Sequence, residues 1–167
     1  MEGLLRKGNK VWLSKSENPN RKLKYTLQMI EVNLSKVGVN THLTNKIVFE
    51  ALENELIEDF QKKGEIKKEI KFGKNSRFDF LIQKKNKRSF IEVKNVTLSR
   101  KKGIAEFPDA ITSRGLKHIN ELLEAHKHGY EIYLLFVVQR DDCTEFKLAK
   151  DIDPKYSECL LKAVKKN

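Results

Sequence analysis

The sequence predicts an α/β fold in which a central mixed sheet carries a helix on each face, with a small β unit in front of it. Strand-like segments alternate with amphipathic helical ones, and the late segment 131–139 is almost continuously apolar. The chain has 167 residues, enough for one domain with a hydrophobic core and too few for two full-sized domains. Its 39% hydrophobic content excludes a disordered chain.

The beginning of the chain is expected to form the small β unit. Segments Lys10–Leu13 and Tyr25–Val32 read as strands, and the sequence SENPNRK between them favours a reversal of the chain. We expect Trp12 and Tyr25 to fill the core of this unit. The alternative is that the two rings stack on nucleic-acid bases.

The next elements alternate between helix and strand. From Asn45 the apolar residues recur with helical spacing, which predicts an amphipathic helix of about four turns that ends near Gly64. Three strands follow, at Glu69–Phe72, Arg77–Ile82 and Ser89–Val96. The polar sequence QKKNKR joins the last two strands, so we expect them to form an antiparallel hairpin.

The last third of the chain is predicted to contain two helices around one strand. The sequence SRKKGIAEF reads as a loop, and Asp109 is placed to cap a helix over roughly 110–128, which Gly129 ends. The apolar run Glu131–Gln139 is typical of a strand buried on both faces. A final short helix is expected over about 154–163.

The charge of the chain is unevenly distributed. The net charge of +11 equals the excess within residues 61–102, which hold 15 Lys or Arg and only four acidic residues. A concentrated basic segment points to a polyanionic partner. No apolar run is long enough to span a membrane, and we expect a soluble, cytoplasmic protein whose Cys143 and Cys159 are ordinary thiols.

Three side chains within the basic segment could carry chemistry. Alternation along the predicted strands places Glu92 and Lys94 on one face, aims Asp79 away from its two phenylalanine neighbours, and brings Asp79 and Glu92 together across the hairpin. Two adjacent carboxylates favour a hard cation such as Mg²⁺ or Mn²⁺, and Lys94 could position a water beside it. The alternative is an amphipathic sheet whose charged face simply meets water.

The spacing of Asp79 and the sequence Glu92-Val93-Lys94 resembles the PD-(D/E)XK nuclease superfamily. The runs NTHLTNKIVFEAL, RFDFLI, IEVKNVTL, FPDAITSRGLKHINEL, LFVVQR and IDPKY are together similar to the sugar fermentation stimulation protein A family, SfsA. The first residues, LLRKGNKVWLSKSENPNRK, resemble the part of that family that forms a small OB-like barrel.

The resemblance implies a restriction-endonuclease-like mixed sheet flanked by helices at 41–167, preceded by a partial OB-like β unit at 1–40. It also implies a DNA-binding protein in which Asp79 and Glu92 hold the metal. Lys94 matches the catalytic lysine, and Glu50 matches the additional acid of the first helix. Glu55 falls inside the apolar arc of that helix and competes with Glu50 for this role.

Several further residues are candidates for the site or for nucleic-acid contact. Asp109 follows a proline but comes after Glu92, so Asp79 is the aspartate of the motif. Gln139 matches a position near the site in related folds, although it could equally be a polar strand end. Candidate contacts to nucleic acid, with a solvated surface as the alternative for the helical ones, are Arg77, Arg100, Lys101, Lys102, Arg114, Lys117 and His118.

Three functions remain open on the sequence. The first is a DNA-binding protein with a Mg²⁺-dependent phosphodiesterase site, and the second is a non-catalytic DNA-binding regulator of sugar (maltose) metabolism genes on the same fold. The third is a basic assembly module whose lysines dock an acidic protein or RNA. The chain is shorter at both ends than the family pattern. We therefore expect exposed strand edges to pair with a partner chain, which makes a homo-oligomer a further expectation.

Overall fold

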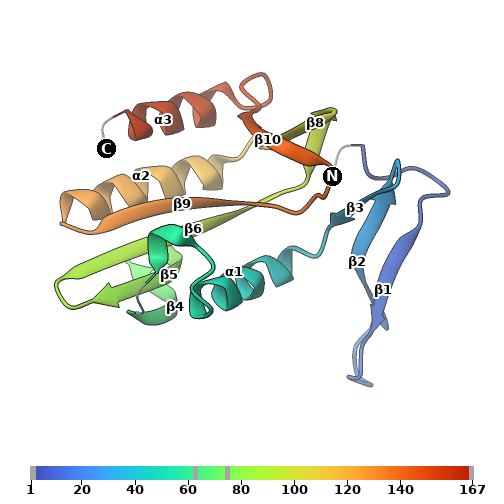
Figure 1. The fold of residues 1–167 in the computed structure, drawn as a ribbon, viewed down its shortest axis with the longest axis horizontal. Helices are drawn as coiled ribbons and strands as arrows, with labels where there is room; N and C mark the ends of the chain where they lie inside the picture. Colours follow the sequence, from blue (N-terminus) through green and yellow to red (C-terminus); the bar gives the residue numbers. More distant parts are fainter. Residues whose placement is uncertain (1–2, 62–63, 74–75, 166–167) are drawn as a thin grey trace.

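The computed structural model describes residues 3–61, 64–73 and 76–165. It contains three small sheets and three helices, with the two later helices on one side of the central sheet and the first helix on the other (Figure 1). This is the mixed α/β arrangement predicted from the sequence. Lys62, Lys63 and Lys74 of the basic segment lie outside the described residues.

The first sheet is an antiparallel meander of β1 (Val11–Lys15), β2 (Tyr25–Val32) and β3 (Ser35–Gly38). The third strand was not predicted. It is reached by a two-residue turn at Asn33 and Leu34, whose φ angles of 52° and 70° are typical of a tight hairpin turn. No glycine marks this turn, so the signal for the strand is absent from the sequence.

The first helix is shorter than predicted. After a 3₁₀ turn at Thr41–Leu43, α1 runs over Thr44–Glu53 and ends at Asn54, and a second 3₁₀ turn at Glu58–Phe60 follows. Glu55 has a φ of 56°, a left-handed conformation that a helix cannot continue through. The prediction that the helix extends to about Gly64 was therefore wrong.

The central sheet has the order β4-β5-β6-β9, with β4 (Glu65–Phe72), β5 (Ser76–Lys84), β6 (Lys87–Val96) and β9 (Glu131–Val138). The predicted hairpin between β5 and β6 is confirmed, with Phe80 opposite Ile91 and Lys84 opposite Lys87. β9 runs parallel to β6. The chain makes this crossover through the helix α2, because a parallel connection needs a long segment.

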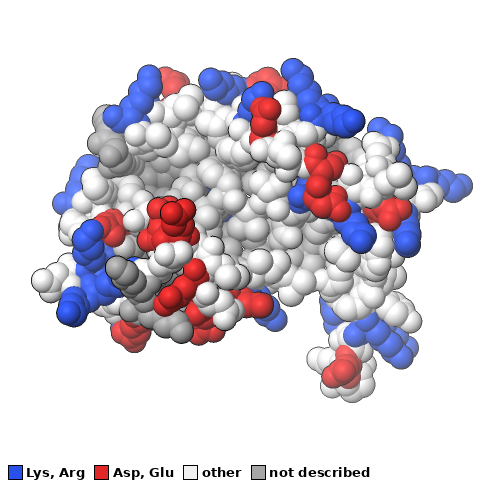
Figure 2. All heavy atoms as spheres, in the orientation of Figure 1, with Lys and Arg blue, Asp and Glu red and all other residues white. Residues whose placement is uncertain are grey.

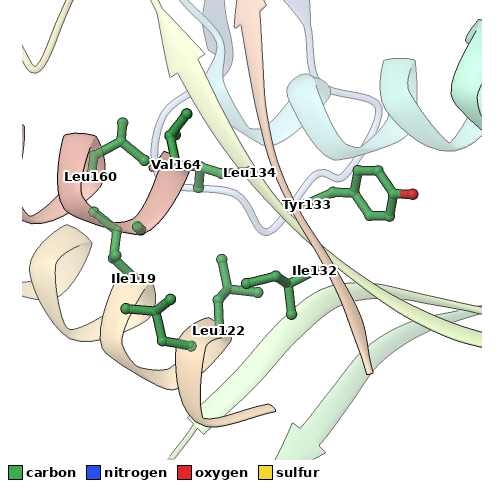
Figure 3. Close-up of a pocket in the computed structure, with 9 residues that line it drawn as sticks. Ile119, Leu122, Ile132, Tyr133, Leu134, Leu160 and Val164 are labelled. Atoms are coloured by element: carbon green, nitrogen blue, oxygen red, sulfur yellow. The ribbon is translucent and has the colours of Figure 1, made fainter. Parts of the chain in front are cut away.

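β9 lies at the edge of the sheet, and its side chains are half-buried from Glu131 to Val137. Its side chains pack against the apolar clusters on both faces of the sheet, Tyr133 and Leu135 on one and Ile132 and Leu134 on the other, so the prediction of two covered faces holds, but the burial is partial. Figure 3 shows Ile132 and Leu134 directed toward a hollow of about 280 Å³ between β9 and the two later helices, whereas Tyr133 points to the other side of the strand.

The two later helices cover one face of the central sheet. α2 (Ser113–Lys127) begins at Thr112, whose hydroxyl accepts a hydrogen bond from the Gly115 amide, so Asp109 is not its cap. Gly129, with a φ of 84°, follows its end as predicted. α3 (Pro154–Val164) confirms the final helix, with Asp153 as its N-cap.

Two apolar clusters hold the helices to the sheet. Val48 and Leu52 of α1 pack with Phe80 and Ile91 on one face, and Leu122 of α2 packs with other sheet residues on the opposite face. The second face includes Phe78, Leu81, Phe90 and Ala125. Burial of these side chains on both faces fixes the orientation of the polar residues that lie between them.

The segment predicted as a loop after β6 forms part of a third sheet. β7 (Leu98–Lys101) and β8 (Gly103–Phe107) are antiparallel, and β10 (Cys143–Leu148) adds to β8 in parallel, giving the order β10-β8-β7. The lysine-rich sequence concealed the local hairpin of β7 and β8, although Gly103 with a φ of 79° lies at its turn, whereas β10 joins β8 from a distant segment of the chain. In the described residues, no helix is long and apolar enough to cross a membrane.

The first sheet is joined to the end of β9 by backbone hydrogen bonds. The Gly38 amide donates to the Gln139 carbonyl at 2.8 Å, and Val37 forms an isolated bridge with Arg140. The Lys36 amide donates to the Asp141 carboxylate at 3.0 Å. These contacts attach β3 directly to the chain that leaves the central sheet.

Candidate metal and nucleic-acid site

Glu92 and Lys94 lie on β6 and face α2, as their alternation with Ile91 and Val93 predicts. The Lys94 ammonium lies 2.7 Å from the Glu92 Oε1, and the two side chains are only 11% and 5% exposed. This burial rules out the alternative of a charged sheet face that meets water. A buried charge is costly unless it is paired, so the two side chains stabilise each other in their ionised forms.

His118 of α2 completes this cluster. Its Nδ1 contacts the Glu92 Oε1, and its Nε2 accepts a hydrogen bond of 3.4 Å from the Arg114 Nε. The Lys94 Nζ also lies 3.3 Å from the His118 Nδ1, so the imidazole contacts both members of the ion pair. The predicted nucleic-acid residue His118 is therefore buried beside the carboxylate.

Asp79 lies on β5 at the point where pairing with β6 stops. The last paired residue is Phe80, and the Asp79 Oδ2 instead accepts a hydrogen bond of 2.7 Å from the Val93 amide. The expectation that both neighbouring phenylalanines face one side was wrong, because Phe78 and Phe80 pack in clusters on opposite faces. The change of face at Asp79 directs its carboxylate toward the backbone between Glu92 and Lys94.

A second donor to Asp79 comes from α1. The Asn45 Nδ2 donates to the Asp79 Oδ1 at 2.7 Å. From the sequence, Asn45 is predicted only to begin a helix. A polar side chain in the first turn that faces the sheet is the signal that could have identified its contact with Asp79. The first helix thus supplies an amide to the candidate site.

The two carboxylates have opposite shifts of pKa. Burial and the nearby charge of Glu92 raise the pKa of Asp79 above its ordinary value, and the hydrogen bonds from Val93 and Asn45 only partly offset this. Burial also acts to raise the pKa of Glu92, but hydrogen bonds and charges from His118 and Lys94 outweigh it and lower that pKa. Of the two carboxylates, Asp79 is therefore the one that would gain most from an added cation.

The pair suits a hard divalent cation. Two carboxylates offer oxygen ligands, and a cation between them would relieve the repulsion that raises the pKa of Asp79. Among the described residues, no cluster of three or more His, Cys, Asp or Glu side chains is arranged to hold a metal. The remaining ligands would then be waters or substrate oxygens, which is usual for Mg²⁺.

Glu50 and Glu55, the two acids that the sequence predicts for the site from the first helix, lie in different surroundings. Glu50 is exposed on α1, and within the described ranges no hydrogen bond or ion pair connects its side chain to Asp79, Glu92 or Lys94. Glu55 lies beyond the end of α1 and is half-buried in a left-handed conformation. Helical periodicity placed Glu55 on the apolar arc only because the helix was assumed to continue.

Gln139 belongs to a neutral network beside the site. Its Nε2 donates to the Thr44 hydroxyl at 3.3 Å, which in turn donates to the Asn95 Oδ1 at 2.9 Å. Asn95 follows Lys94 on β6 and points to the opposite face of the strand. The network links the end of β9 to the start of α1.

The predicted nucleic-acid residues differ in how they are held. Arg100 bonds to the carboxylates of Glu106 and Asp151 and so ties β7 to the segment after β10. Lys101 and Lys102 are exposed and line a hollow of about 510 Å³ against the first sheet. The other positions are exposed with polar neighbours: Arg77 near Glu69, Arg114 beside His118, and Lys117 near Glu121.

Tyr156 is a buried residue near the site that sequence reasoning did not identify. It is 0% exposed, its ring lies against Phe107 at 5.4 Å between centroids, and its hydroxyl has no hydrogen-bond partner among the described residues. A Cβ added at Gly115 would lie 3.1 Å from the Tyr156 ring, so glycine there allows the close approach of α2. Burial and the charge of Glu92 raise the pKa of Tyr156.

The chain is similar to known proteins over nearly its whole length. Residues 42–167 match the model described as the sugar fermentation stimulation protein RE domain, and residues 1–39 match the SfsA N-terminal OB domain. A sugar fermentation stimulation protein homolog of Pelagibacter ubique is 53% identical over 99% of this chain and 71% of its own length. A homolog of Brucella anthropi is 44% identical over 98% of this chain and 71% of its own length.

A solved structure is also similar. Pyrococcus furiosus SfsA, described as a complex with Ca²⁺, matches with a TM-score of 0.83 and 28% identity, over 93% of this chain and 65% of that chain. The present chain thus spans about two thirds of the length of its solved relative. On the match of both family models, the chain belongs to the sugar fermentation stimulation protein family, SfsA.

Proposed function

We propose that this chain binds DNA and hydrolyses its phosphodiester bonds with a Mg²⁺ or Mn²⁺ ion held by Asp79 and Glu92. The observation that carries the proposal is the buried cluster in which Glu92 is paired with Lys94 while the adjacent Asp79 has a raised pKa and only neutral hydrogen-bond donors. The Ca²⁺ complex of the Pyrococcus furiosus relative supports a divalent cation in this family.

Each side chain of the cluster has a separate role in this proposal. Lys94 presents an ammonium group that can orient a water for attack on phosphorus, and its ion pair with Glu92 fixes the position of that group. His118 and Asn45 orient the two carboxylates. A bound divalent cation supplies charge neutralisation at the phosphate and a more acidic water. In the hydrolysis, the water oxygen forms a bond to phosphorus and gives its proton to solvent, the ester P–O bond breaks, and the leaving oxygen takes a proton from solvent.

The test is Mg²⁺-dependent cleavage of plasmid and single-stranded DNA by the full chain. Lys94→Ala should lower the rate about 100-fold or more, as expected for a positioned catalytic side chain. Lys87→Ala is the matched control, because Lys87 lies on the same strand, is 72% exposed in its side chain and pairs with Glu131 away from the cluster. Absence of cleavage by wild type with Mg²⁺ or Mn²⁺ on all these substrates would overturn the catalytic proposal.

A second candidate is a DNA-binding regulator of sugar (maltose) metabolism genes that does not cleave. The observation that favours it is the excess of 15 Lys or Arg over four acidic residues within residues 61–102, which can attract a polyanion without a metal. This function predicts DNA binding that falls steeply with salt and is unchanged by EDTA. Metal-dependent turnover that Lys94→Ala abolishes would exclude it.

A further inference from the structure

Arg114 lies in the first turn of α2, one side chain away from the ion pair of the candidate site. Its Nε donates to the His118 Nε2 at 3.4 Å. The Nδ1 of the same ring contacts the Glu92 Oε1 and lies 3.3 Å from the Lys94 Nζ. A single imidazole ring therefore separates the guanidinium group from the buried pair.

The start of α2 is held firmly in place. The Asp153 carboxylate accepts a hydrogen bond of 2.9 Å from the Thr112 amide and another of 3.0 Å from the Tyr156 amide. One side chain thus joins the first turns of α2 and α3. Because residues four apart in a helix lie on the same face, this backbone also fixes Arg114 beside His118.

The guanidinium group has donors that no other described residue uses. Arginine has five N–H donors, and only the one on Nε is bonded among the described residues. Arg114 is exposed, whereas the Lys94 side chain is 11% exposed and its ammonium is paired with Glu92. A ligand that approaches from solvent would therefore meet the two Nη groups before it reaches Lys94.

Other residues predicted to contact nucleic acid have acidic partners. Arg100 bonds to two carboxylates, and Arg77 and Lys117 lie 3.4 Å and 3.5 Å from one carboxylate each. Acidic and basic side chains are mixed in this way over the face of the molecule that Figure 2 shows. Arg114 differs, because the imidazole that it contacts offers no negative charge.

Two lysines of the first sheet are also engaged, by an aromatic ring. The Lys10 Nζ lies 5.0 Å and the Lys36 Nζ 6.0 Å from the centroid of Trp12. The ring lies outside the buried cluster of this sheet, which it was expected to fill. These ammonium groups cover the ring and leave Arg114 as the cation next to the candidate site whose charge is not neutralised.

The uncompensated charge of Arg114 suits a phosphate group. Arginine stays protonated, so its repulsion by the nearby Lys94 ammonium persists until an anion lies against it. The Nη1 and Nη2 groups form a fork that matches two oxygens of one phosphate. Negative charge on these oxygens grows as a phosphodiester is hydrolysed, so a donor placed here stabilises the transition state more than the bound substrate.

We propose that Arg114 is a catalytic residue whose Nη1 and Nη2 bind the two non-bridging oxygens of the phosphodiester that is hydrolysed. Lys94 orients the water, and Arg114 orients the phosphate and stabilises the charge that develops on it. Arg114 keeps its proton throughout, so the bonds made and broken are those of the hydrolysis already described. This role rests on the proposed function, because the site at Asp79 and Glu92 supplies the reaction.

Cleavage of plasmid DNA with Mg²⁺ provides the first test. Arg114→Ala should lower kcat about 100-fold, as for the loss of one donor to a developing oxyanion. Arg114→Lys should recover only a small part of the rate, because an ammonium group does not bind two oxygens at once. Guanidinium chloride at roughly 20 mM, far below the molar concentrations that unfold proteins, should partly restore the rate of Arg114→Ala, and equal NaCl should not.

Arg88→Ala is the matched control. Arg88 lies on β6, the strand of Glu92 and Lys94, is exposed and has its guanidinium 4.9 Å from the Tyr130 ring centroid. Its replacement should leave kcat unchanged with or without guanidinium. A loss of rate in folded Arg114→Ala that guanidinium does not restore would mean that Arg114 acts only through His118, which would overturn the inference.

A second measurement does not depend on cleavage. The Nε–H signal of Arg114 in a ¹⁵N spectrum is identified by its absence from Arg114→Lys, and dimethyl phosphate is added to the full chain in Mg²⁺ and again in EDTA. We expect the signal to shift in wild type and in Lys94→Ala, and to stay in place with the neutral trimethyl phosphate.

The outcomes separate this role from the proposed function. A shift without metal-dependent cleavage by wild type would reject the hydrolysis and retain Arg114 as a phosphate-binding residue. Cleavage with an unchanged kcat in Arg114→Ala would overturn only the role of Arg114. The absence of a shift in both Mg²⁺ and EDTA would also overturn it, whether or not the chain cleaves DNA.

Discussion

Asp79 and Glu92 lie on neighbouring strands, yet the surroundings of the two carboxylates differ in charge. On the α2 side, Glu92 contacts Lys94 and His118. On the α1 side, Asp79 receives hydrogen bonds from neutral donors, the Asn45 amide and the Val93 backbone. The fold therefore stabilises Glu92 as an anion by its own side chains and gives Asp79 neutral donors only, a contrast that the proposed divalent cation would complement.

Glu92→Gln should give the largest effect, because it leaves the buried Lys94 without its partner. We expect the free energy of unfolding at pH 7 to fall by about 3 kcal/mol, as for other buried pairs that lose one member. The pKa of Glu92 is lowered in the fold, so its contribution is present above the ordinary pKa of 4.5 and is lost as the pH falls through the lowered value.

Chemical denaturation at pH 7 and at about pH 3 checks this prediction. The difference between wild type and Glu92→Gln should shrink in acid. A constant difference between the two pH values would mean that Lys94 and His118 do not stabilise the ionised form of Glu92. Lys87→Ala, on the same strand, provides a baseline for removal of an exposed ion pair.

Tyr156→Phe tests whether the buried Tyr156 hydroxyl, near Glu92, lacks a hydrogen-bond partner in solution. The Tyr156 hydroxyl is buried and has no partner in the described part of the chain, so its removal should raise the free energy of unfolding by about 1 kcal/mol. Thermal and urea denaturation measure this. A decrease in stability on substitution would instead show that the hydroxyl is bonded in solution, and Ser157→Ala, which removes the neighbouring unpartnered hydroxyl, is the matched comparison.

Asp79→Asn should give the smallest effect and the opposite sign from Glu92→Gln. The fold raises the pKa of Asp79. The stability that the protonated carboxyl contributes is therefore fully present below the ordinary pKa of 3.8 and is lost as the pH rises through the raised pKa. The variant should therefore gain stability at pH 7, by less than about 1 kcal/mol, and lose this advantage in acid. Added Mg²⁺ should raise the melting temperature of wild type and not of the variant.

The sequence predicted those parts of the fold that local pattern determines. The β5–β6 hairpin, the last helix and the stop at Gly129 each have a turn or cap residue beside an alternating segment. β10 lacks such a signal, because it pairs with the distant β8, and the lysine-rich sequence of β7 concealed the hairpin that turns at Gly103. The end of α1 depends on the left-handed backbone at Glu55, which helical spacing of apolar residues cannot indicate.

The sequence also predicted part of the candidate site. Alternation along β6 was sufficient to place Glu92 and Lys94 on one face. Asn45 had only the weak signal of a polar side chain in the first turn of a helix, and Tyr156 had none, since both reach the site through the packing of α1 and α3 against other elements. The position of Asp79 required the irregular pairing near Phe80, where a side chain takes the place of a backbone partner.

The junction of β3 with the end of β9 has a consequence for unfolding. Because Gly38 and Val37 are bonded to the backbone at Gln139 and Arg140, the first sheet is attached to the chain that leaves the central sheet. The two sheets should therefore melt in one transition, so that the fluorescence of Trp12, the one tryptophan of the sequence, and circular dichroism should give the same midpoint.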